Sequence, residues 1–124
     1  MPQGSPKRIF LDDIRDPPIG NWILARTAHD FIERMVQHRG NVTVVALDHD
    51  LEFCAYGGGG YNSLTFDGTW VARWMVKNNM FPSDKIYVHS MNHHGAERMV
   101  GILAGASEAK VIRISYDDLK KLTW

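Results

Sequence analysis

Three short polar clusters of this sequence hold side chains that could do chemistry. They are Asp12 and Asp13 in FLDDIRDPP, Asp48, His49 and Asp50 in ALDHDL, and His89, Ser90 and Asn92 in VHSMN. Buried carboxylates repel one another unless they are protonated, paired or bound to a metal ion. If the clusters meet, their oxygen atoms favour a hard divalent cation, Mg²⁺ or Mn²⁺, and the imidazoles offer acid–base chemistry near neutral pH.

The elements that must position these clusters follow from the hydrophobic pattern. Apolar runs rich in β-branched residues predict strands at 8–11, 22–25, 42–47, 85–90 and 110–115. Helical spacing predicts a helix between the cap Thr27 and Gly40, a second after the cap Asp67, a third at 94–104 and a short one at 116–122. This alternation predicts a mostly parallel sheet covered on both faces, with ligands beyond the carboxyl ends of its strands. All three clusters fall at such ends.

Bulk properties narrow the class of protein. The 124 residues suit one compact domain, so we expect a disordered tail at 1–7 and a single α/β domain at 8–124. Fourteen basic residues balance fourteen acidic ones, which argues against a clamp for duplex DNA but allows a small phosphate-containing ligand or an RNA end. Cys54 is the only cysteine, and no apolar run approaches the roughly 20 residues that span a bilayer. We expect a cytoplasmic protein with no membrane partner.

Each cluster also has an interpretation that needs no special chemistry. Acidic pairs after strands are often solvated turn residues, and Ser90 and Asn92 are common N-cap types. Glu97 fits an ordinary charge on a helix surface. The run GGGG at 57–60 fits no Gly-rich phosphate motif, although its glycines could belong to a lid over a site.

Taken together, FLDDIRDPP, LDHDL and VHSMNHHGAERM resemble the signatures of the cyclic-phosphate-processing receiver-like domain, a relative of response-regulator receivers. The resemblance covers about 8–115 and implies a three-layer, flavodoxin-like α/β sandwich with a five-stranded sheet. It matches Asp12 and Asp13 to the acidic pair that binds Mg²⁺ in receivers. It also matches Asp48 to the phosphoacceptor and Ser90 to the hydroxyl that contacts the phosphoryl group.

The chain departs from the receiver pattern in three ways. No lysine follows VIRIS at the receiver position, and two histidines, His49 and His89, enter the motifs. A Pro-rich loop replaces the first crossover helix, which is therefore expected to be missing or reduced. The orientation of the strand at 22–25 stays open.

The leading hypothesis is a metal-dependent phosphoesterase that processes a cyclic phosphate, either a 2′,3′-cyclic end or a cyclic nucleotide. Its candidate catalytic residues are Asp48, His89 and His49. Its candidate ligands to Mg²⁺ or Mn²⁺ are Asp12, Asp13, Asp48 and Asp50. Its candidate phosphate or substrate contacts are Arg15, Ser90, Asn92, Gly58, Gly59 and Glu97.

Two other hypotheses remain open. One is a module that binds a cyclic nucleotide or a protein partner without chemistry, and the other is a phosphoacceptor receiver at Asp48. Strand alternation sends His49 the opposite way from Asp48 unless the turn redirects it. The order of the catalytic candidates is therefore Asp48, His89, His49.

Overall fold

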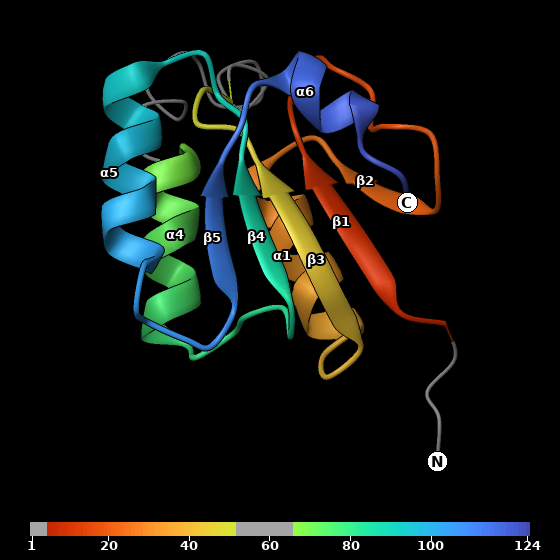
Figure 1. Cartoon of the computed structure of the whole chain (residues 1–124). Coiled ribbons are helices and arrows are strands. Elements are labelled where there is room, and N and C mark those ends of the chain that lie inside the picture. Colours follow the sequence, from red (N-terminus) through yellow and green to blue (C-terminus); the bar gives the residue numbers. More distant parts are fainter. Residues whose placement is uncertain (1–4, 52–65) are drawn as a thin grey trace.

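The computed structural model describes residues 5–51 and 66–124, and these residues form a parallel five-stranded sheet (Figure 1). In chain order the strands are β1 (Lys7–Leu11), β2 (Trp22–Ala25), β3 (Val42–Leu47), β4 (Lys85–Val88) and β5 (Lys110–Arg113). Their order in the sheet is β2-β1-β3-β4-β5, and every neighbouring pair is parallel. The predicted fold class is confirmed, and the strand at 22–25 runs parallel to β1.

The boundaries of the first strand differ slightly from the prediction. β1 begins at Lys7, inside the stretch that we expected to be a tail, and the Lys7 backbone N–H donates to the Asn41 carbonyl at 2.9 Å. Parallel pairing with Val42 of β3 therefore extends the strand to that residue. Residues 1–4 lie outside the described residues.

Four helices lie in the described part of the chain, each behind a capping side chain. They are α1 (Ala28–Gln37), α4 (Gly68–Lys77), α5 (His93–Leu103) and α6 (Tyr116–Lys121). The side chains that accept a backbone N–H of the first turn belong to Thr27, Asp67, Asn92 and Ser115. These caps satisfy amides that would otherwise lack a partner and fix where each helix begins. None of these helices is long and apolar enough to cross a membrane.

The two faces of the sheet are covered unequally. Helices α1, α4 and α5 pack over the larger apolar cluster, which contains Leu11, Leu47 and Val88. The opposite face carries Phe10 and Tyr87 and is covered by the short helix α6 and by C-terminal side chains. Figure 1 shows α1 behind the sheet and α6 in front of its upper end. Side chains that alternate along each strand therefore reach two different environments.

The connection from β1 to β2 contains no helix, as predicted from its prolines. Arg26 holds this loop in place through its guanidinium. It donates to the Arg15 carbonyl at 2.6 Å, to the Asp12 carbonyl at 3.2 Å and to the Asp16 carboxylate at 2.9 Å. Because of these bonds the loop stays at the carboxyl end of the sheet.

Candidate functional site

Three buried carboxylates meet at the carboxyl ends of β1 and β3. Asp12, Asp13 and Asp48 each offer one oxygen, and these oxygens all lie within 4.8 Å of one another. The three residues are 1%, 4% and 5% exposed. The first two polar clusters of the sequence therefore converge as the parallel topology predicted.

Strand register explains the convergence. Leu11 of β1 pairs with Leu47 of β3, and Leu47 pairs with Val88 of β4. The residues that follow these positions, Asp12, Asp48 and His89, therefore leave the sheet side by side. The third polar cluster joins the same rim.

Asp12 is held as a carboxylate by several donors. Its Oδ1 accepts the backbone N–H groups of Ile14 at 3.0 Å and Arg15 at 2.9 Å, and His89 Nε2 lies 3.1 Å from its Oδ2. Burial on its own raises the pKa of Asp12, but the His89 hydrogen bond and the two backbone N–H groups outweigh it, so the pKa is lowered. Asp12 therefore stays ionised at neutral pH.

Asp48 is in the opposite situation. Burial and the negative charge of Asp12 raise the pKa of Asp48 to about 6, against the lowering effects of His89, the His49 backbone N–H and the Ser90 hydroxyl. The folded protein thus places Asp48, whose ionisation is disfavoured, beside the ionised carboxylate of Asp12. A divalent cation would relieve that repulsion, and three buried carboxylate oxygens are the donor set that Mg²⁺ or Mn²⁺ prefers. The residues present therefore fit such an ion.

His89 is fully buried beside this cluster. Its ring stacks on Phe10, with centroids 4.8 Å apart and planes 9° from parallel. Since Asp12 is an ionised acceptor, Nε2 of His89 carries the proton of their hydrogen bond. Nδ1 is buried and has no hydrogen-bond partner among the described residues. In the neutral ring this nitrogen is an unused proton acceptor.

His49 turns away from the carboxylate cluster, in the direction that strand alternation predicted. Its Nδ1 lies 2.7 Å from Asp50 Oδ1, and its Nε2 lies 3.4 Å from Asp67 Oδ2 at the start of α4. The ring packs on Gly95 of α5 so tightly that a Cβ there would lie 2.5 Å from ring carbons. This geometry makes His49 a packing residue between the turn and two helix starts.

The carboxylates line an open pocket of about 260 Å³, called the acidic pocket below. Its lining residues are Asp12, Asp13, Ile14, Arg15, Asp48, Asp50, Ser90 and Met91. Arg15 is the only lysine or arginine among these described residues, and its Nη1 lies 3.8 Å from Asp12 Oδ2. Sequence reasoning missed Ile14 and Met91, which are 67% and 75% exposed on the rim. The feature of the sequence that could have revealed them is a large apolar side chain directly after Asp13 and after Ser90, at positions where a solvated loop would favour polar residues.

The remaining candidates lie at different distances from this pocket. Ser90 is buried, contacts Asp48 and accepts the Asn92 N–H at 3.1 Å. Asn92 caps α5 and donates to Asp50 at 3.2 Å. Glu97 is exposed on α5 and does not line the acidic pocket. Gly58 and Gly59, with the lid expected around them, lie outside the described residues.

The fold and the site together define a receiver-like α/β domain with a carboxylate cluster at the carboxyl ends of its strands. The family model of the cyclic-phosphate processing receiver domain matches residues 7–105. The chain belongs to this family. The match includes all three motifs that carry the sequence resemblance, and that resemblance is confirmed. No curated protein and no solved structure matches the chain.

Proposed function

We propose that this domain is a metal-dependent phosphoesterase that opens a cyclic phosphate, on a small nucleotide or at an RNA end. The observation that carries the proposal is the set of three buried carboxylates whose oxygens lie within 4.8 Å of one another, beside a buried imidazole. The family description, cyclic-phosphate processing, supports the kind of substrate. The zero net charge of the chain argues against duplex DNA as a partner.

Asp12, Asp13 and Asp48 would hold Mg²⁺ or Mn²⁺. Asp50 lines the same pocket and adds negative charge at its exposed edge. When bound, the ion supplies positive charge that polarises a phosphoryl oxygen and lowers the pKa of a nearby water. The buried position of the three ligands keeps their charges poorly screened, which strengthens their attraction for a cation.

The side chains around the pocket supply the remaining functions. The Arg15 guanidinium neutralises charge on the phosphate, and the Ser90 hydroxyl orients it. Water adds to phosphorus as one ring P–O bond breaks. A proton leaves the water and a proton reaches the departing oxygen, so the net change is one water consumed. His89 would hold or move this proton, because Asp12 fixes its Nε2 and its Nδ1 has no hydrogen-bond partner in the part of the chain that the structure describes.

The experiment is a turnover assay on cyclic phosphates. Purified protein is incubated with 2′,3′-cyclic mononucleotides, 3′,5′-cyclic nucleotides and short RNAs ending in a 2′,3′-cyclic phosphate, with Mg²⁺, Mn²⁺ or EDTA. We expect a linear phosphate product that requires the metal and is lost in Asp48→Asn. Asp84→Asn is the matched control, because Asp84 is exposed at the opposite end of the sheet, before β4.

Two outcomes would replace the proposal. Metal-dependent binding without product from any of these substrates would identify a binding module. Covalent labelling by acetyl phosphate that disappears in Asp48→Asn, again without hydrolysis of a cyclic phosphate, would identify a phosphoacceptor.

A further inference from the structure

A second pocket adjoins the acidic pocket and has the opposite charge. It has a volume of about 500 Å³ and is called the basic pocket below. Its lining residues are Arg15, His89, Ser90, Met91, His93, Arg113, Ser115, Tyr116 and Asp117. The acidic pocket contains four aspartates and one arginine, whereas this one contains two arginines and one aspartate. Arg15, Ser90 and Met91 line both pockets, so the two share a wall.

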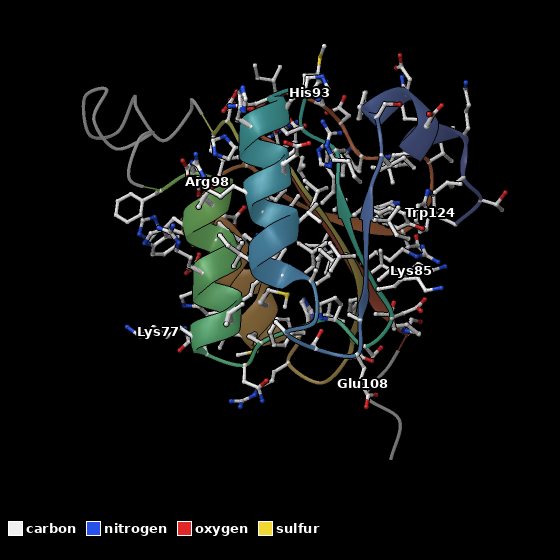
Figure 2. The ribbon with its side chains drawn as sticks, turned by 60° about the vertical axis from the view of Figure 1, so that its left-hand side comes forward. Lys77, Lys85, His93, Arg98, Glu108 and Trp124 are labelled. Atoms are coloured by element: carbon white, nitrogen blue, oxygen red, sulfur yellow. The ribbon has the colours of Figure 1, made fainter. Side chains whose placement is uncertain are left out.

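The nitrogen-rich side chains of this pocket come from the β1–β2 loop (Arg15), the end of β5 (Arg113) and the start of α5 (His93). Arg113 ends β5, and its Nη2 lies 3.3 Å from Nδ1 of His93, the first residue of α5. Because a guanidinium can only donate, His93 accepts this hydrogen bond and keeps its Nε2 for another partner. Figure 2 shows His93 at the upper end of α5, whereas Lys85, the first residue of β4, lies lower in the molecule. His93 is therefore at the end of the molecule where the strands finish. The positive end of the α5 dipole lies at the same place.

The aspartate of the pocket does not cancel this positive charge. The Asp117 carboxylate lies 3.9 Å from the Lys120 ammonium. The Tyr116 ring lies under two cations, with Arg15 Cζ 5.1 Å and Lys120 Nζ 4.7 Å from its centroid. The Tyr116 ring therefore holds the Arg15 and Lys120 cations in place and has no free face on which a nucleobase could stack.

His89 gives an independent sign that the pocket receives a ligand. It lines the pocket, its side chain is 0% exposed, and its Nδ1 has no hydrogen-bond partner among the described residues. A buried polar atom without a partner costs stability, so its presence beside a cavity calls for a group that completes it. A hydroxyl group of a bound ligand would do so by donating a hydrogen bond to Nδ1.

We infer that the basic pocket binds a second phosphate of the substrate. This rests on the proposed function, in which the first phosphate occupies the acidic pocket with the metal ion. The two pockets share a wall, so one ligand can reach both. The preferred substrate class is then a nucleoside that carries the cyclic phosphate on one side and a second phosphate on the other, as the terminal residue of an RNA does. A cyclic mononucleotide fills only the acidic pocket.

The test uses linear nucleotides, so that it does not depend on turnover. Adenosine 3′,5′-bisphosphate and adenosine 3′-monophosphate are titrated into the full chain by calorimetry in the presence of Mg²⁺. We expect the bisphosphate to bind at least about tenfold more tightly, since a charge-assisted guanidinium–phosphate contact is among the stronger polar contacts. Arg113→Ala should remove most of this preference and leave the affinity for the monophosphate within about twofold.

Arg98→Ala is the matched control, since Arg98 is exposed on α5 and does not line the pocket. Thermal melting of both variants checks that they fold. If Arg113→Ala weakens the binding of both nucleotides equally, the basic pocket binds the only phosphate of the monophosphate. If Arg113→Ala leaves the preference for the bisphosphate unchanged, the basic pocket binds no phosphate. Either result overturns the inference. Failure of the turnover assay alone would refute the phosphoesterase and leave this binding preference measurable.

Discussion

Asp48→Asn should stabilise the metal-free protein at neutral pH. Burial and the Asp12 charge raise the pKa of Asp48 from 3.8 to about 6, so the folded state disfavours its ionised form. A shift of about two pK units corresponds to about 3 kcal/mol, which is the upper limit of the gain. The substitution retains an oxygen that can accept the His49 backbone N–H, which now bonds Asp48 Oδ1 at 2.8 Å. With about 4 °C per kcal/mol for a domain of this size, the melting temperature should rise by several degrees.

The gain should depend on pH in a defined direction. A carboxyl whose folded-state pKa is raised costs stability above that pKa, and the cost disappears below the unfolded-state pKa. The difference between Asp48→Asn and wild type should therefore be full above pH 6, fall to roughly half near pH 5 and vanish below pH 4. Asp12 behaves oppositely. Its pKa is lowered, so its favourable contribution is present at neutral pH and is lost in acid in both proteins.

Urea unfolding in EDTA at several pH values measures this difference, with Asp84→Asn as a control that should change little. Saturating Mg²⁺ should then stabilise wild type by about 3 kcal/mol at a hundredfold excess over its dissociation constant, and Asp48→Asn much less. The reasoning is refuted if Asp48→Asn destabilises the metal-free protein near pH 7, or if the difference between the two proteins does not vary with pH.

Two further predictions concern the residues that support the site. Gly95→Ala should lower the free energy of unfolding by about 1–3 kcal/mol, because the added Cβ would meet the His49 ring. Gly101→Ala, on the same helix but facing open space, should raise it by up to about 1 kcal/mol. Urea unfolding curves that show equal effects for the two variants would contradict this contrast. His89→Leu should raise the pKa of Asp12 by removing its hydrogen bond, which carboxyl NMR titration of the metal-free protein measures, while His89→Gln, which keeps an N–H donor, should raise it less.

The convergence of the acidic groups could be predicted from the sequence because it depends only on topology. Once short apolar runs alternate with helices, the strands are parallel and their carboxyl ends share one rim. Asp12 and Asp48 follow neighbouring strands, so their proximity needs no detailed side-chain geometry. The direction of His49 could likewise be predicted, because side chains alternate along a strand.

The basic pocket could not be predicted in the same way. The contact between Tyr116 and Asp16, whose hydroxyl and carbonyl oxygens are 2.6 Å apart, joins residues 100 positions apart in the chain. It depends on the path of a loop with no periodicity, and loop paths follow from specific hydrogen bonds such as those of Arg26. In the sequence, Arg113 appears only as a charged residue within the apolar run of a predicted strand, KVIRIS.

The missing crossover helix explains why the two pockets lie next to each other. A helix placed directly after the acidic pair would carry the chain away from the rim and over the face that holds Phe10. The short loop instead remains at the rim, where the Asp16 carbonyl accepts the Tyr116 hydroxyl and the Arg15 guanidinium lies over the Tyr116 ring. Arg15 is thereby placed on the wall that the two pockets share. The departure from the receiver pattern thus provides a cation between a site suited to a metal ion and a site suited to a phosphate, which is the arrangement that a substrate with two phosphates requires.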